Sequence, residues 1–307
     1  MRVLVTGALG KVGRATVPAL QRAGYTVTAT DLANPEWDRG PDGTPGYVKA
    51  DLSDAGEVYA LVGGAVTEGP APGRFDAVVH TAALPAPGRH APHVVFRNNI
   101  MATFNVVEAC VRWGVPRLVN LSTESVPGFV FPERPFVPDY LPLDEAHPVA
   151  PQDPYALSKY FGEQLCAAAT QRSDLRCISL RPAWVQSPES YHRNLGPLVR
   201  EPGPSTTAWA YIDVYDLADA IVLAVGSDLP GHEVFGVASP DTVGGVDLHE
   251  MWRKWFPDSH TELRPVDRPD ASGIDIRRAR ELLGWRPSRS WRDYLTATGE
   301  PVSPPTA

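Results

Sequence analysis

The first 121 residues alternate between short apolar segments typical of buried strands and longer segments typical of helices. Strands are expected at 2–6, 25–30, 46–50, 75–80 and 117–121, with helices at 11–23, 54–62 and 94–113. Such alternation favours right-handed crossovers and a parallel sheet with helices on both faces. The sequence therefore predicts an α/β fold with a doubly wound parallel sheet, whose strands end in polar turns where a ligand would bind.

The second half of the chain is less regular, and we expect it to add a smaller C-terminal lobe. After a Pro-rich loop at 126–151, helices are expected at 154–171, 214–226, 246–256 and 276–283, and strands at 176–181, 208–212 and 233–237. The domain boundaries predicted are a first domain at 1–182, a smaller lobe at 183–298 interleaved with it, and a frayed tail at 299–307. The Gly/Pro-rich stretches 34–45 and 63–73 are expected to be exposed.

Composition restricts the class of function. A chain of 307 residues with 43% hydrophobic and 21% charged content buries a sizeable core. The net charge of -8 and the absence of a Lys/Arg block argue against nucleic acid or an anionic membrane as partner and favour a small molecule. The apolar run after Met1 is too short for a signal peptide or a spanning helix, which predicts a cytoplasmic protein.

Cysteine and histidine placement gives no sign of a disulfide or a metal site. Cys110, Cys166 and Cys177 stand singly in apolar segments, so we interpret them as reduced core residues. The eight histidines lack metal-ligand spacing, and no metal is expected.

A glycine-rich turn lies between the first strand and the first helix. Residues 7–13 read G-x-x-G-x-x-G, a spacing that lets the backbone approach a pyrophosphate while the helix N-terminus holds its charge. A helix cap without a ligand is the alternative. The context favours a Rossmann-type dinucleotide site with contacts from Gly7, Leu9, Gly10, Lys11, Val12 and Gly13.

Two acidic strand ends extend this site. Asp31, beside Leu32, closes the second strand, where a carboxylate accepts hydrogen bonds from the adenosine ribose and repels a 2′-phosphate. NAD is therefore favoured over NADP, although Arg14 could still reach a phosphate. Asp51, followed by Leu52, ends the third strand, where it either accepts from the adenine amine or caps the next helix.

Tyr155 and Lys159 are four residues apart on a predicted helix, so their side chains share one face. An ammonium beside a phenol stabilises the phenolate and lowers its pKa toward the range useful for acid/base chemistry. The chain has only four lysines, which makes a chance pair improbable. A solvated surface pair is the alternative reading.

These motifs together resemble the extended short-chain dehydrogenase/reductases, the NAD-dependent epimerase/dehydratase family. The matching segments are Thr6 to Gly13, Asp31, Asp51-Leu52, His80-Thr81-Ala82-Ala83, Asn99 with Thr103 and Asn105, Leu121-Ser122-Thr123, Tyr155 with Lys159, and Leu180-Arg181-Pro182. Residues 209–218 and 282–287 look like the family's second-lobe strand and helix and its C-terminal signature. The resemblance covers nearly the whole chain and implies an enzyme that uses NAD.

The resemblance also implies roles for further residues. Thr123 would hydrogen-bond the substrate oxygen and Tyr155 would take the alcohol proton. Lys159 would lower the pKa of Tyr155 and hold the nicotinamide ribose, while hydride passes to NAD. The other cofactor contacts implied are Thr81, Ala82, Ala83, Asn99, Leu121, Ser122, Pro182, Ala183 and Val185.

The length of the segment from Arg181 to Trp209 restricts the possible reactions. Sugar-nucleotide epimerases of this family usually have a longer loop and helix here, which bind the nucleotide. Residues 122–129 are similar in part to uronate dehydrogenases, and Glu124-Ser125 departs from the Asp-Glu pair of common dehydratases. The main expectation is thus an NAD-dependent dehydrogenase acting on a sugar, sugar acid or related polyol. The alternatives are an NDP-sugar epimerase of the C4 type with tightly bound NAD, and a non-catalytic NAD(P)-sensing protein.

Candidate substrate contacts are Leu84, Thr123, Glu124, Ser125, Trp184, Arg193 and Trp209. Arg193 could clamp a carboxylate, with Arg200 as a second candidate, and aromatic residues including Tyr211 could wall a sugar face. A solvated arginine and an ordinary core aromatic are the alternatives. A homodimer through helices 94–113 and 154–171 is expected, as is usual in the family.

Overall fold

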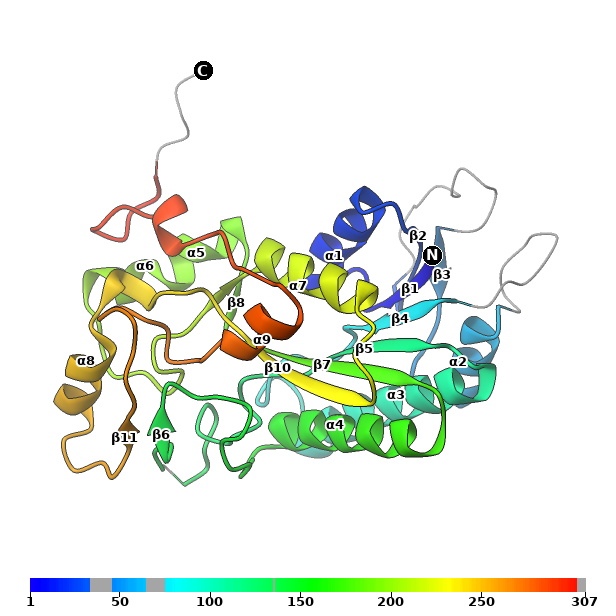
Figure 1. Ribbon diagram of the computed structural model, residues 1–307, viewed down its shortest axis with the longest axis horizontal. Coiled ribbons are helices and arrows are strands. Elements are labelled where there is room, and N and C mark those ends of the chain that lie inside the picture. Colours follow the sequence, from blue (N-terminus) through cyan, green and yellow to red (C-terminus); the bar gives the residue numbers. More distant parts are fainter. Residues whose placement is uncertain (34–45, 65–74, 135, 303–307) are drawn as a thin grey trace, which may run out of the picture.

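The computed structural model describes residues 1–33, 46–64, 75–134 and 136–302, and its centre is a seven-stranded parallel sheet (Figure 1). The strand order is β10-β7-β5-β4-β1-β2-β3. These strands are β1 (Arg2–Thr6), β2 (Thr26–Asp31), β3 (Tyr47–Lys49), β4 (Ala77–His80), β5 (Arg117–Leu121), β7 (Arg176–Pro182) and β10 (His232–Val237). The predicted Rossmann-type sheet is confirmed. The stretch 34–45 and residues 65–73, expected to be exposed, lie outside the described residues.

Helices cover both faces of the sheet because alternate strand residues supply two separate cores. Val3 and Val5 of β1 join one cluster of buried residues, whereas Leu4 joins the other. The helices on the first face are α1 (Lys11–Arg22), α7 (Val214–Gly226) and α9 (Arg277–Leu282). Those on the second face are α2 (Ala55–Val62), α3 (Pro92–Trp113) and α4 (Pro154–Arg172) (Figure 1).

The strand order reverses between β1 and β4. From β1 the chain proceeds outward to β2 and β3, then returns to place β4, β5 and β7 on the other side. In open α/β sheets the crevice at such a reversal, beyond the carboxyl ends of the strands, is where ligands bind. The glycine-rich turn after β1 and Thr81 after β4 both lie at this point.

The smaller elements gather at one end of the large sheet (Figure 1). They are the paired strands β6 (Tyr140–Leu141) and β11 (Glu262–Leu263), the paired strands β8 (Val185–Gln186) and β9 (Ile212–Asp213), and the helices α5 (Pro188–Asn194), α6 (Gly196–Arg200) and α8 (Leu248–Trp255). The two halves exchange elements: β6 lies before residue 182, while β10 and α7 lie after it yet belong to the large sheet and its face.

Two expectations for the second half are wrong. The strand predicted at 208–212 is reduced to β9, because Ala208 and Trp209 have φ of 48° and 56°, in the left-handed region that a strand excludes. Residues 299–302 are not a frayed tail. The Val302 amide donates to the Tyr294 carbonyl at 2.9 Å, and Glu300 pairs with Arg200. Residues 303–307 lie outside the described residues.

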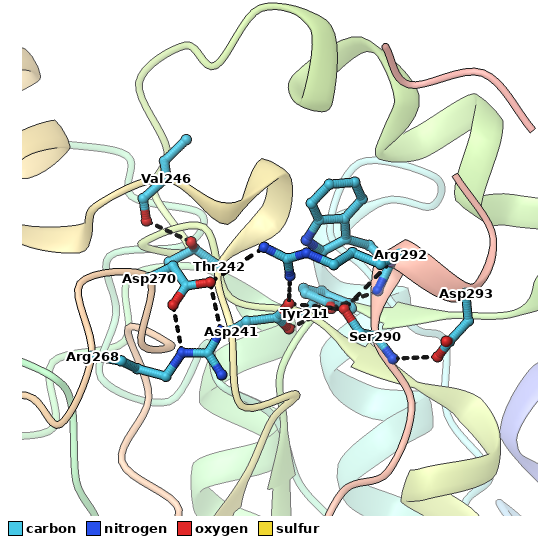
Figure 2. A network of polar contacts seen from close by, with 10 residues as sticks. Tyr211, Asp241, Thr242, Val246, Arg268, Asp270, Ser290, Arg292 and Asp293 are labelled. Carbon is cyan, nitrogen blue, oxygen red and sulfur yellow. Dashed lines mark hydrogen bonds and ion pairs between the residues drawn. The ribbon is translucent and has the colours of Figure 1, made fainter. Parts of the chain in front are cut away.

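A buried carboxylate fastens the C-terminal part of the chain to the lobe (Figure 2). Asp241 accepts hydrogen bonds from the hydroxyls of Tyr211 at 2.7 Å and Ser290 at 2.8 Å, and it pairs with Arg292. Arg292 also contacts Asp270 at 3.3 Å. Removing one partner from a buried charge network is costly, so these contacts hold the segment after α9 in place.

Candidate active site at the carboxyl edge of the sheet

The glycine-rich turn requires glycine at two positions. Gly7 has φ of 67°, and a Cβ there would lie 2.6 Å from the Ala82 backbone. A Cβ on Gly13 would lie 2.3 Å from the Gly7 carbonyl oxygen. The turn therefore presses against both the segment after β4 and the first turn of α1, and Gly10, the N-cap of α1, leaves the helix N-terminus without a side-chain cap. This leaves backbone amides at the turn for an anion such as pyrophosphate.

Asp31 lies beside this turn at the end of β2. Its carboxylate accepts hydrogen bonds from the amides of Leu9 at 2.9 Å and Leu32 at 2.8 Å. Arg14 donates to the Leu9 carbonyl at 2.7 Å, and Lys11 donates to the Val185 carbonyl at 2.9 Å. The acid is thus held at the rim of the turn, and Lys11 links the turn to the second lobe.

Asp51 does not cap α2. The N-cap is Asp54, whose side chain accepts from the Glu57 amide at 3.0 Å. Asp51 instead accepts from the amide and the hydroxyl of Ser53, at 2.9 and 2.8 Å. Of the two readings of Asp51, the helix cap is wrong, and the contact with adenine stays a prediction.

A cavity of about 370 Å³ opens between these strand ends. Among the predicted cofactor contacts it is lined by Gly7, Leu9, Gly10, Asp31, Leu32, Asp51, Leu52, Thr81, Ala82 and Ala83. Leu84, predicted as a substrate contact, also lines it, and so do four residues that the sequence motifs did not point to, namely Ala50, Ser53, Asn98 and Ala102. Asn98 and Ala102 are four residues apart on the same helix as Asn99, so their side chains share one face. This spacing could have pointed to both residues from the sequence.

Asn99 ties the loop after β4 to α4. Its side chain accepts from the Leu84 amide at 2.8 Å, donates to the Leu84 carbonyl at 3.0 Å, and donates to the Ser158 hydroxyl at 3.3 Å. His80, at the end of β4, contacts the hydroxyls of Thr6 and Thr103 at 2.8 and 3.2 Å. Burial and the nearby Lys159 charge lower the pKa of His80 to about 3, so its ring is neutral.

The structure brings Thr123, Tyr155 and Lys159 together at the ends of β5 and α4. Lys159 donates to the carbonyl of Leu121 at 2.7 Å, and Thr123 lies close enough to Tyr155 to lower the pKa of its phenol. Asp153 caps α4 by accepting from the amides of Tyr155 and Ala156, both at 2.9 Å. The helix start and the end of β5 thereby fix these side chains relative to one another.

Burial changes the pKa values of both Tyr155 and Lys159. Burial raises the pKa of Tyr155 to about 12, against a lowering by nearby Thr123, and Asp153 and Glu124 raise it further. Burial lowers the pKa of Lys159 to about 8, while Glu163 raises it. The expected lowering of the Tyr155 pKa is therefore wrong for the protein alone, because loss of solvation for the phenolate outweighs the lowering by Thr123.

Glu124 and Ser125 complete the segment after β5. Glu124 is buried, and burial raises the pKa of its carboxyl well above the ordinary value, against an opposing hydrogen bond from the Trp184 backbone. Burial therefore favours the protonated form of this carboxyl, which lies near Tyr155. Ser125 is held by Thr123, whose hydroxyl donates to the Ser125 hydroxyl at 3.1 Å.

The other substrate candidates fare differently. Trp184 is 38% exposed, and Arg193 is exposed as well. Burial lowers the pKa of Lys11, and the nearby charge of Arg193 lowers it further. The structure contradicts a substrate contact by Trp209, which is 1% exposed and packs edge-on against Trp252. Tyr211 is likewise buried, and Arg200 is paired with Glu300.

The residues predicted at the nicotinamide half follow β7. Pro182 ends that strand, the Ala183 amide donates to the Val237 carbonyl at 2.9 Å, and Val185 begins β8. Leu121 and Ser122 end the neighbouring strand, and the Ser122 amide donates to the Leu180 carbonyl at 2.7 Å. These backbones therefore lie along one continuous edge with the turn and Tyr155.

Three further observations concern the described ranges only. The three cysteines are buried and unpaired, and no group of three or more metal-binding side chains occurs. No described helix combines the length and apolar character needed to cross a membrane.

Comparison with known proteins identifies this architecture. Residues 3–238 match the model of the NAD-dependent epimerase/dehydratase family. A UDP-glucose 4-epimerase of Azospirillum brasilense is 29% identical over 96% of this chain and 89% of its own length. A UDP-galactose 4-epimerase structure superposes with a TM-score of 0.66 at 25% identity, covering 98% of this chain and 97% of that one. A mutated uronate dehydrogenase structure gives 0.65 at 24% identity, covering 95% and 84%. The chain is an enzyme of the NAD-dependent epimerase/dehydratase family.

Proposed function

We propose that this protein binds NAD at the carboxyl edge of its sheet and uses Tyr155, Lys159 and Thr123 to move hydride to and from a hydroxyl-bearing carbon of a sugar nucleotide. The observation that carries the chemistry is the placement of buried Thr123 near Tyr155, on the helix that also carries the buried ammonium of Lys159. The close backbone approach at Gly7 and the cavity beside Asp31 support the cofactor.

The proposed cofactor contacts follow the described edge. The turn holds the pyrophosphate, Asp31 accepts from the adenosine ribose, and Asp51 with Ser53 and Asn98 borders the adenine side of the cavity. The segments after β4, β5 and β7 border the nicotinamide half. NAD is favoured over NADP because the Asp31 carboxylate would repel a 2′-phosphate.

Each catalytic side chain has a defined task. The Thr123 hydroxyl orients the substrate oxygen, and Tyr155 takes or returns its proton. Lys159 supplies a positive charge that favours the phenolate, in addition to the charge of the nicotinamide. NAD, when bound, accepts the hydride and can return it.

The substrate class rests on the relatives. UDP-glucose 4-epimerases recur among them at 27 to 29% identity. They favour the epimerase, the alternative expectation from the sequence, over a dehydrogenase for free sugars. In an epimerase the ketone intermediate has to rotate while the nucleotide part keeps it bound to the enzyme. The hydride then returns to it, so no net NADH is released.

Oxidation of a free sugar or sugar acid is the second candidate, because many arginines of the second lobe are paired with carboxylates and so are less available to a diphosphate. Within the described residues Arg200, Arg268 and Arg292 each pair with a carboxylate, as do Arg264, Arg277, Arg278 and Arg289. Arg193, exposed near Lys11, remains for a substrate carboxylate or phosphate.

One assay separates the candidates. The purified protein is incubated with NAD and UDP-glucose, UDP-galactose, free aldoses or uronates, while NADH absorbance and the sugar products are followed. Interconversion of UDP-sugars without net NADH supports the epimerase, and net NADH from a free sugar supports the second candidate.

Tyr155→Phe should lower turnover in that assay by about 10²-fold to 10⁴-fold, the usual contribution of a general acid/base. Tyr160→Phe, on the same helix, is the matched control and should leave turnover near the wild-type value. Unchanged turnover in Tyr155→Phe would overturn the proposed chemistry.

A further inference from the structure

Glu163 is a buried acid to which the sequence motifs assign no role. Tyr155, Lys159 and Glu163 are spaced four residues apart on α4 and lie along one face. All three are buried, and Glu163 is only 2% exposed. An isolated carboxylate is not kept in such a place unless charges and hydrogen bonds satisfy it.

Its partners come from the ends of two neighbouring strands. Glu163 accepts a hydrogen bond from the Ser122 hydroxyl at 2.6 Å, next to the residue whose carbonyl receives the Lys159 ammonium. Arg181, near the end of β7, donates to both oxygens of Glu163, at 2.8 and 2.7 Å. Successive turns of α4 thus hold the successive residues Leu121 and Ser122, and Thr123 follows directly.

The charges around Lys159 make Glu163 its compensating group. On α4 the charged group that acts on Lys159 is Glu163, one turn further along the helix, and on β4 Lys159 faces His80, which is neutral. Beyond Glu163 lie Arg181 on β7 and His232 on β10, whose pKa burial lowers. Lys159 and Arg181 are therefore two buried cations that face a single buried anion.

We propose that Glu163 is a positioning residue, whose carboxylate fixes the end of β5 against α4 and keeps Lys159 protonated beside Tyr155. The importance of a protonated Lys159 rests on the proposed function, but the ionisation of Lys159 can be measured without a substrate. Glu163 does not line the cavity beside the glycine-rich turn, and in this proposal it acts through Lys159 and through the backbone that carries Thr123.

The test measures Lys159 directly. The chain has four lysines, so protein labelled with ¹³C at the lysine Cε gives few resonances, and a Lys159→Arg variant identifies the one from Lys159. In the wild type this resonance should titrate below the other lysines, since burial lowers the Lys159 pKa to about 8. Glu163→Gln should lower the midpoint by about one pH unit or more, because an opposite charge at close range shifts a pKa by about 1 to 3 units.

Control variants distinguish an effect of Glu163 on Lys159 from a general loss of protein stability. Glu163→Asp keeps the charge and should restore most of the midpoint. Asp241→Asn is the matched control, because Asp241 is also a buried acid held by an arginine and by hydroxyls (Figure 2), and it should leave the Lys159 midpoint unchanged. If Glu163→Gln fails to fold with Arg181 unpaired, the double variant Glu163→Gln/Arg181→Met removes both charges and should still show the lowered midpoint.

A Lys159 midpoint equal to that of the wild type in the folded Gln variant, single or double, would overturn the proposal. A lowered midpoint that Glu163→Asp restores would support it. Failure of every sugar to turn over would instead contradict the proposed function, and the titration would still decide the role of Glu163.

Discussion

Glu124 shows how far burial alone can change one side chain. Loss of solvent raises the pKa of its carboxyl well above the ordinary value, and the hydrogen bond from the Trp184 backbone only partly opposes this. The folded protein therefore binds a proton at Glu124 more tightly than the unfolded chain does, in which a glutamate has a pKa of about 4.3. Folding is favoured by this group below that pH, and the contribution is lost as the pH rises.

Glu124→Gln should consequently stabilise the protein at pH 7, because glutamine resembles the neutral acid and releases no proton on unfolding. The gain grows with the displacement of the Glu124 pKa, by about 1.4 kcal/mol for each unit. Urea unfolding at pH 7 and near pH 4 measures it, and the difference from wild type should close at the lower pH. Glu281→Gln, at an exposed position, should show no such trend. A Glu124→Gln variant no more stable at pH 7 would contradict a raised pKa of Glu124.

At the scale of elements, the turn between β1 and α1 serves both the packing of the fold and the proposed binding of the cofactor. Gly7 combines a positive φ with close approach to the Ala82 backbone, so a side chain there would force apart two strand ends that border the cavity. Gly24, after α1, has φ of 84°, and no atom lies within 4 Å of the position that a Cβ would occupy there. A side chain at Gly24 would cost only backbone strain, whereas one at Gly7 would also collide with neighbouring atoms. Comparing the two positions therefore separates these effects.

Gly7→Ala should weaken NAD binding about tenfold or more, because strain of about 1 to 3 kcal/mol falls on the site itself. Gly24→Ala should cost about 1 kcal/mol of stability and leave NAD binding unchanged. Isothermal titration with NAD measures the first effect and thermal unfolding the second. Equal NAD affinity in Gly7→Ala and wild type would remove the turn from the cofactor site.

For the molecule as a whole, the outer faces of α3 and α4 suggest how two copies meet. Met101 and Phe104 on α3 and Phe161 on α4 are 38 to 41% exposed, and these two helices pack against each other. We propose a two-fold dimer through this pair of helices, since isologous dimers are the commonest oligomers. Exposed apolar side chains of this kind mark such surfaces when they gather together.

Phe161→Glu should convert the dimer to a monomer, because it places a charge at the proposed apolar interface. Analytical ultracentrifugation at several concentrations measures the mass of the assembly. Trp255→Glu, at a position on α8 with similar exposure, should leave the mass unchanged. A wild-type protein that stays monomeric at all concentrations would contradict the proposed dimer.

The sequence by itself determined the large sheet, the glycine-rich turn, and the polar strand ends, because periodicity and glycine spacing are local properties of the chain. It placed β5 and α7 at their observed bounds and named Thr123, Tyr155 and Lys159. Only the tertiary structure decided the rest. The packing of all surrounding segments decided that Trp209 is buried in the core, and burial raised the pKa of both Tyr155 and Glu124. The partnership of Glu163 with Ser122 and Arg181 likewise joins residues 18 to 41 positions apart, which only the packing of α4 against β5 and β7 brings together.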